Sequence, residues 1–297
     1  MPGDETSQGR AVLRLTGDYF LRWADLASDL FDGDHLRALV LNTVLHLNVH
    51  GVHEDTVLNL RYAGQEPPPD SARRPVTVSE AARAMAMPRV TAGRYIKTLV
   101  GTGSIVAVGR SGYIVPSRQI LNPPSLAMTD PLYSNLLQLI RRLRSQGLLP
   151  GDIDGGRCGR DQRYRLVLRA NGEFVGDWIR PWNRHYPTGY LFGLVFSVIL
   201  QANDRARIEA GYELADGAKT PISAHAIATS LKLPAETVRR HILRLEADGV
   251  VLRTGAGLII PAAVWSTPLG RELLANAGDS VARLNRMLLD TDVSLTA

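Results

Sequence analysis

The chain has 297 residues, of which 45% are apolar and 21% are charged, so a folded protein is expected and wholesale disorder is excluded. Its formal net charge is +5 and its sequence pI is about 9.5, which favours an anionic partner such as nucleic acid. A single cysteine, Cys158, excludes an internal disulfide bond and any zinc site that needs several cysteines.

The expected cellular location follows from the N-terminal residues and from the length of the longest apolar run. Residues 1–10 are polar and lack the apolar core of a secretion signal, so we expect a flexible N-terminus there. The longest apolar run, near residues 190–200, is shorter than the ~20 residues that span a bilayer. The sequence therefore predicts a cytoplasmic protein with no membrane partner.

Three blocks of sequence recur in the same order, which predicts that the chain consists of two homologous halves. We expect the first block to form a strand, the second to form two helices and a hairpin, and the third to form an amphipathic helix. The matching ranges are 12–23 with 167–178, 76–116 with 222–261, and 135–146 with 280–291.

These blocks define the expected domains. The first half covers residues 11–147, with its core at 76–116, and the second half covers residues 161–297, with its core at 220–261. Residues 148–160 are rich in glycine and include a proline, so they are predicted to form a linker.

The second core shows its helices through caps and spacing. Ser223 can cap a short helix that ends near Leu231, and Pro234 can begin a second helix that runs to about Ala247. The second helix has a buried stripe at i, i+4 and i+7, formed by Val238, Ile242 and Leu245.

A hairpin follows the second helix. Asp248 and Gly249 end the helix, because glycine suits the left-handed cap position. Two short β-rich runs then flank Gly255 and Gly257. Helix, turn, helix and hairpin in this order are typical of a winged helix-turn-helix, and the first core repeats the pattern. We therefore expect a mainly α fold with small β-wings, in which tandem duplicated winged helix-turn-helix domains form a pseudo-two-fold single chain.

The stretch TVRRHILRLEADGVVLRTGAGLII, residues 237–260, resembles the DNA-binding domain of GntR-type bacterial regulators and, more loosely, of MarR-type regulators. The resemblance covers about 40 residues in each copy, and the rest of the chain matches no effector domain of those families. It implies that the second helix of each copy enters the major groove of double-stranded DNA.

The expected contact residues are the outward side chains of these two helices and the wing residues that follow them. Residues 81–129 contain six Lys or Arg and no Asp or Glu, and residues 218–261 contain six against three. Arginine can pair with guanine through two hydrogen bonds, while lysine and threonine more often contact phosphates. The predicted DNA-binding residues are Arg89, Thr91, Arg94, Lys97, Arg110 and Ser111 in the first copy, and Glu236, Thr237, Arg239, Arg240, Arg244 and Arg253 in the second.

The function expected from this pattern is sequence-specific transcriptional regulation through two recognition helices. If the halves mimic a symmetric dimer, these helices enter successive major grooves ~34 Å apart. Two other functions fit tandem winged helices: a plasmid-type replication initiator and a protein-interaction adaptor. The surplus of arginine argues against the adaptor.

The sequence shows no catalytic motif, so we expect neither an enzyme nor a cofactor. A small-molecule effector and a homodimer are both left open.

Two further clusters have more than one explanation. His46 and His50 lie at i, i+4 near His53, a pattern that can bind zinc or nickel, although Gly51 is expected to disturb the helix and a solvated helix end is favoured. Several arginines crowd the linker and the predicted strand after it, and contact with DNA phosphates or pairing with acids would explain them equally well. These arginines are Arg157, Arg160, Arg163, Arg165 and Arg169.

Overall fold

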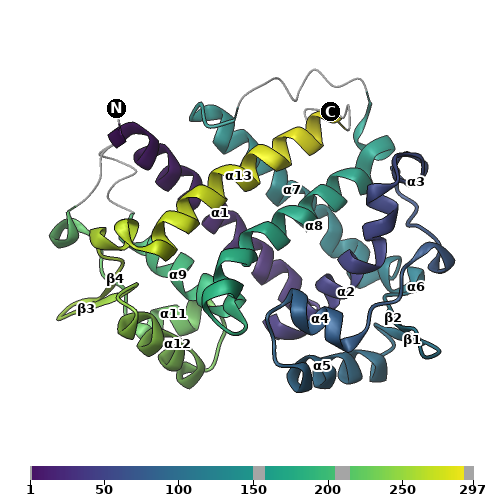
Figure 1. Cartoon of the computed structure of the whole chain (residues 1–297), viewed down its shortest axis with the longest axis horizontal. Coiled ribbons are helices and arrows are strands. Elements are labelled where there is room, and N and C mark those ends of the chain that lie inside the picture. The colour runs from purple at the N-terminus through teal and green to yellow at the C-terminus, as the bar shows by residue number, and fades with distance from the viewer. Residues whose placement is uncertain (1, 150–157, 205–214, 291–297) are drawn as a thin grey trace. The chain divides into compact units, whose positions relative to one another are not determined.

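The computed structural model describes residues 2–149, 158–204 and 215–290. Within this part the chain is mainly helical and contains two small antiparallel hairpins, which confirms the expected fold class at that level (Figure 1). None of the described helices is both long and apolar enough to cross a membrane. The hairpins join β1 (Val106–Val108) to β2 (Gly112–Ile114) and β3 (Leu252–Thr254) to β4 (Gly257–Ile259).

The chain divides into two compact units, which we name after their hairpins. The β1–β2 unit comprises Leu26–Asp177 and Ser280–Ala297, and the β3–β4 unit comprises Met1–Asp25 and Trp178–Asp279. These units differ from the two sequence halves, because their boundaries fall within three long helices. The divided helices are α1 (Pro2–Asp29), α8 (Arg160–His185) and α13 (Pro268–Asp290).

The remaining elements follow the same order in both units. The β1–β2 unit contains α2 (His35–Glu54), α3 (Thr56–Arg61), the short 3₁₀ helix η1 (Asp70–Ala72), α4 (Val78–Ala84), α5 (Arg89–Gly101), α6 (Ser117–Ile120) and α7 (Pro123–Ser145). The β3–β4 unit contains α9 (Gly189–Asn203), η2 (Asp216–Ala218), α11 (Ala224–Ser230), α12 (Ala235–Ala247) and η3 (Ala262–Ser266).

The first block of each repeat is helical, so the predicted strands at 12–23 and 167–178 are wrong. These residues lie inside α1 and α8. Leu15, Tyr19 and Trp23 are buried at intervals of four residues, which is helical spacing. Helix α1 begins at Pro2, within the stretch that we expected to be flexible, and residues 150–157 of the expected linker lie outside the described residues.

Aromatic side chains form the core of the β3–β4 unit. The rings of Phe20 and Trp178 stack with their centroids 3.8 Å apart, and Trp182 lies 5.0 Å from Phe196. A Cβ atom at Gly193 would lie 2.8 Å from the Trp178 ring, so glycine is needed for α9 to approach α8 this closely. Helix α9 is buried on nearly all faces, as its apolar sequence predicts.

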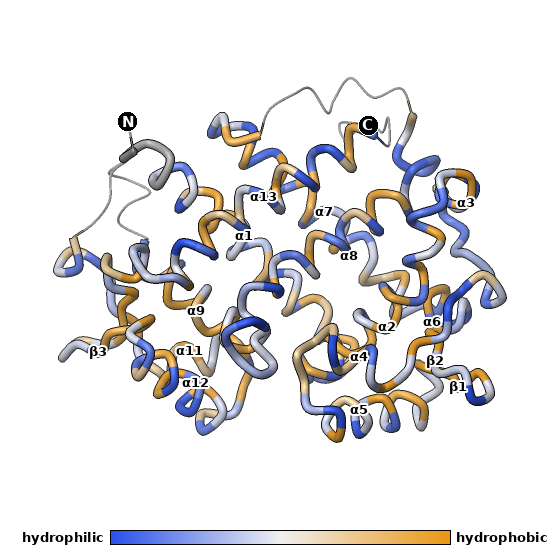
Figure 2. Tube along the Cα trace, viewed as in Figure 1, coloured by the Kyte–Doolittle hydropathy of each residue, from blue (hydrophilic) through white to orange (hydrophobic). Residues whose placement is uncertain are grey.

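One helix of each unit supports the helix-turn-helix segment, which we define as residues 76–116 in the first unit and 222–261 in the second. Helix α2 contacts α4, α5 and β2, and α9 contacts α11, α12 and β4. Apolar and polar residues are interspersed along α5 and α12 (Figure 2), and the buried ones recur every three or four positions, so each helix has one apolar face. The buried residues of α12 are those predicted, Val238, Ile242 and Leu245, and their equivalents in α5 are also buried: Ala92, Ile96 and Leu99.

An equivalent buried asparagine fixes each hairpin to its supporting helix. Asn48 of α2 donates to the carbonyls of Arg74 and Tyr113, and its Oδ1 accepts from the backbone N–H of Val115. In the other unit Asn203 of α9 makes the same three types of contact. It donates to the Thr220 and Leu258 carbonyls and accepts from Ile260 N–H. The two supports are therefore alike down to single hydrogen bonds.

Candidate nucleic-acid interface

The turns that lead into α5 and α12 have the same local design. Ala86 and Lys232, at equivalent positions, both adopt a positive φ, of 46° and 52°. Pro88 and Pro234 then occupy the N-cap positions, so α12 begins one residue after the predicted start at Pro234, and neither proline provides a side-chain hydrogen bond to the first turn. The positive end of each helix dipole is therefore not compensated by its cap residue, a condition that favours a nearby anion.

The outer face of α5 carries exposed cations without acidic partners. Arg89, Arg94 and Lys97 are exposed, and Thr91 is partly buried beside them. Within the described residues Arg89 and Lys97 form no hydrogen bond or ion pair. The Arg94 guanidinium lies over the ring of Tyr95, 5.5 Å from its centroid. The first turn of α5 contains no acid, so this face is cationic from its first residue.

The turn of the first hairpin carries the other two predicted residues of this copy. Arg110 and Ser111 lie between β1 and β2 and are both exposed, and no ion pair of Arg110 occurs in the described part of the chain. We define the α5 face as Arg89, Thr91, Arg94, Lys97, Arg110 and Ser111, which are the six residues that the sequence predicts for the first copy.

On α12 most of the predicted cations are paired with acids of their own segment. Arg239 donates to both carboxylate oxygens of Glu236, at 2.7 and 2.8 Å. This pairing lowers the pKa of the Glu236 carboxyl, so the acid is charged at neutral pH. Arg244 donates to Asp248 at 3.0 Å. The formal charge on this helix is thus largely balanced before any ligand arrives.

The remaining predicted residues of the second segment differ in their exposure and in whether an acid pairs with them. Arg253 of β3 lies 2.8 Å from a Glu246 oxygen. Thr237 is partly buried and its carbonyl contacts the ring of His241. Arg240 is exposed, and the described residues offer it no hydrogen bond or ion pair. We define the α12 face as Glu236, Thr237, Arg239, Arg240, Arg244 and Arg253.

Alignment of the two helices shows which positions are alike. Arg94 and Arg240 are equivalent, and both are exposed without an ion pair. One turn earlier, Val90 on α5 stands where Glu236 stands on α12. Val90 is 87% exposed, and an exposed apolar side chain on such a helix can contact a thymine methyl group. Sequence reasoning missed Val90, although the alignment of the repeats places it beside the predicted cations.

The histidines of α2 do not form a metal-binding group. Helix α2 continues through Gly51 to Glu54, so the expected disturbance of the helix is wrong. His46 Nε2 lies 3.4 Å from a Glu173 oxygen, and burial is the largest cause of a lowered pKa at His46 and at His53. Among the described residues no group of three or more His, Cys, Asp or Glu could hold a metal ion.

Comparisons of the chain with known protein families, curated proteins and solved structures found no match. The resemblance to GntR-type regulators therefore depends on the sequence pattern described above.

Proposed function

We propose that the chain is a double-stranded DNA-binding transcriptional regulator with two winged helix-turn-helix domains in tandem. In this proposal α5 and α12 are recognition helices, and the hairpins β1–β2 and β3–β4 are their wings. The protein acts by binding and not by catalysis. The observation that carries the proposal is the α5 face, which is exposed, cationic and free of acids.

The charges of the α5 face support a phosphate-rich partner. Exposed cations that have no acid of their own remain available to displace the counterions of DNA, and this displacement drives much of the binding free energy. The uncapped N-terminus of α5 adds the positive end of its helix dipole to the same surface. A purely solvated helix usually carries acids among its bases, and α5 carries none.

The α12 face supports a second and weaker contact. Arg240 is available for a base or a phosphate, whereas Arg239, Arg244 and Arg253 must first exchange a carboxylate for a phosphate. Exposed ion pairs are worth little, so this exchange is feasible, but the carboxylates remain close and repel the DNA backbone. We therefore assign the larger share of the affinity to the β1–β2 unit.

The test is selection from a random duplex library, followed by binding titrations of the selected sequence at several salt concentrations. Specific binding should be recovered, and its affinity should fall steeply as salt rises. Replacement of Arg94 and Lys97 by alanine, or of Arg239 and Arg240 by alanine, should weaken binding in each case. If both double variants bind like the wild-type chain, the assigned recognition surface is incorrect.

The control separates a specific effect from a general loss of charge. Arg184→Gln removes an arginine that is paired with Glu272, away from the helix-turn-helix segments in sequence. It should leave DNA affinity within about twofold of the wild-type value, as expected for an exposed ion pair. Capture of a protein partner without any affinity for DNA would instead favour the adaptor function.

A further inference from the structure

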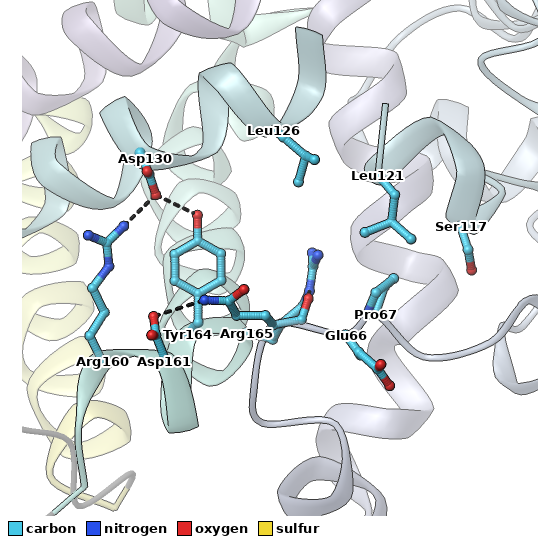
Figure 3. A pocket seen from close by; sticks show the side chains of 11 residues that line it. Glu66, Pro67, Ser117, Leu121, Leu126, Asp130, Arg160, Asp161, Tyr164 and Arg165 are labelled. Carbon is cyan, nitrogen blue, oxygen red and sulfur yellow. Dashed lines mark hydrogen bonds and ion pairs between the residues drawn. The ribbon is translucent and has the colours of Figure 1, made fainter. Parts of the chain in front are cut away.

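The β1–β2 unit contains a cavity that the DNA-binding proposal does not use. Its volume is about 730 Å³, within the range of small-molecule sites. It is lined by α6, α7, the start of α8 and the loop that precedes η1, and all of its lining residues belong to this one unit (Figure 3). Pro67, Leu121 and Leu126 form its apolar side.

A buried arginine presents its terminal nitrogens to this cavity. Arg165 of α8 is only 9% exposed, and its Nε donates to the backbone carbonyl of Gln65 at 2.9 Å. Its two terminal nitrogens have no hydrogen-bond or ion-pair partner among the described residues. The guanidinium faces the space between Tyr164 and Leu121 (Figure 3). Because these two donors are unpaired, they are available to an anion that enters the cavity.

Arg169 adds positive charge beside Arg165, whereas Arg73 is paired with Asp70, whose oxygen lies 3.5 Å from Arg73 Nε. Both arginines are buried, and the charge of Arg165 contributes to the lowered pKa of each, after burial itself. Arg169 donates to the Asn59 side chain and to the Asn59 and Tyr62 carbonyls, none of which carries a negative charge. The sequence left open whether such arginines contact DNA or pair with acids, and Arg165 and Arg169 are too buried for phosphates of a duplex.

The acids around the cavity do not neutralise Arg165. Asp130 is bonded to Arg160 and to the Tyr164 hydroxyl, and Asp161 accepts from the amide of Gln65 at 2.9 Å. Glu66 extends away from the Arg165 guanidinium in Figure 3. The positive charge that faces the cavity is therefore available to a ligand.

We propose that this cavity binds a small organic carboxylate, whose charged group pairs with Arg165 and whose apolar part contacts Leu121 and Leu126. A planar guanidinium with two free donors matches a carboxylate, which it binds through two parallel hydrogen bonds. Leu121 and Leu126 are 46% and 45% exposed, and a bound apolar group would cover them. The site does not depend on the DNA-binding proposal, because its test measures ligand binding directly.

The experiment is saturation-transfer NMR on the full chain with two matched pairs of probes. Phenylacetate and hexanoate carry the charge, whereas phenylacetamide and hexanamide have nearly the same shape without it. At millimolar concentration at least one carboxylate should bind, and its amide should bind at least about tenfold more weakly, since a charged bidentate pair is lost. No binding by either carboxylate, or equal binding by acid and amide, would overturn the proposal.

Three variants locate the binding. Arg165→Gln should weaken carboxylate binding at least about tenfold. Leu126→Trp should weaken it by placing a bulky indole on the apolar side of the cavity, where the apolar part of the ligand would lie, and its exposed starting position makes correct folding expected even if Arg165→Gln proves unstable. Arg118→Gln, at an exposed arginine of α6, is the charge control and should bind like the wild-type chain. Equal loss in Arg118→Gln, or full binding in Leu126→Trp, would place the ligand elsewhere and overturn the assignment.

Discussion

The two helix-turn-helix segments share a scaffold and differ in charge. Both have a positive-φ residue and a proline before the second helix, a buried apolar stripe along it, and an asparagine that holds the hairpin. On the outer face, however, α5 has cations alone, while α12 has cations paired with acids. The two segments thus share these contacts of the scaffold, while the surfaces that they offer to a partner differ.

The difference is concentrated at few positions. Position 90 is valine and its equivalent, 236, is glutamate; position 102 is threonine and its equivalent, 248, is aspartate. Both substitutions put an acid beside an arginine of α12. The comparison therefore predicts equal responses to changes in the scaffold and unequal responses to changes in the outer face.

The largest expected effect concerns the scaffold. Asn48→Ala and Asn203→Ala should each lower the free energy of unfolding by about 2–4 kcal/mol, because each leaves buried backbone groups without a partner. Urea denaturation of the two variants measures this loss. A loss below about 1 kcal/mol in only one variant would show that the two asparagines are not equivalent, and such a small loss in both would show that these hydrogen bonds do not stabilise the fold.

The next largest expected effect is on DNA affinity, and it differs between the equivalent arginines Arg94 and Arg240. Arg94→Ala should weaken binding to the selected duplex by about tenfold or more, as expected for loss of a base or phosphate contact. Arg240→Ala should cost less than about threefold, because Glu236 already lowers the attraction of this face for DNA. Fluorescence anisotropy at two salt concentrations measures both. A larger loss in Arg240→Ala would reverse the assignment of the stronger face.

An exchange of charge between the faces should have a moderate effect. Glu236→Gln frees Arg239 and should raise DNA affinity about two- to fivefold, whereas Val90→Glu on α5 should lower it by a similar factor. The same anisotropy titration applies. Glu272→Gln, which also removes one negative charge from the β3–β4 unit, is the matched control and should change affinity little. If Glu272→Gln matches Glu236→Gln, net charge alone explains the gain.

The smallest expected effect is a pH-dependent change in stability, caused by a helix cap at Glu80 that only the first segment has. Glu80 bonds to Arg74 and to the backbone and hydroxyl of Thr77, which lowers its pKa from 4.5 to about 2. Because the folded pKa lies below the unfolded one, the stabilisation is present above about pH 4.5 and is lost as the pH falls towards 2. Glu80→Ala should therefore cost less than about 1 kcal/mol at pH 7, and this difference should shrink at pH 3.

The second segment provides the control for that experiment. Ser223 caps α11 through a neutral hydroxyl, and Ala226 stands three residues later where α4 has Glu80. The cost of Ser223→Ala should thus not depend on pH over the same range. Urea midpoints of both variants at pH 7 and pH 3 measure the contrast, and a constant cost of Glu80→Ala would mean that its carboxylate is not the stabilising group.

Local signals were sufficient to predict the helix-turn-helix segments. Ser223 caps α11, Pro234 precedes α12, and Asp248 ends it, as the sequence indicates. These features depend on residues close together in the chain. The prediction of a strand at 12–23 is wrong because a short apolar run is compatible with the period of a strand and with that of a helix. The spacing of Leu15, Tyr19 and Trp23 nevertheless indicates a helix.

The charge balance of the candidate site could be predicted only in part. The acid-free stretch around α5 is visible in the sequence. The pairs Glu236–Arg239 and Arg244–Asp248 are also visible as i, i+3 and i, i+4 spacings, but spacing alone does not show that rotamers bring the charges together. The cavity at Arg165 could not be predicted, because it joins residues about 100 positions apart.

The composition of the two units has a consequence for how the protein is made. The ribosome releases the first residues long before residue 178, yet Phe20 of α1 stacks on Trp178. The apolar side of α1 therefore lacks this partner while more than half of the polypeptide is synthesised. Apolar surface that is exposed during this time promotes aggregation. A truncation between residues 147 and 160 would leave neither fragment with a whole unit to fold.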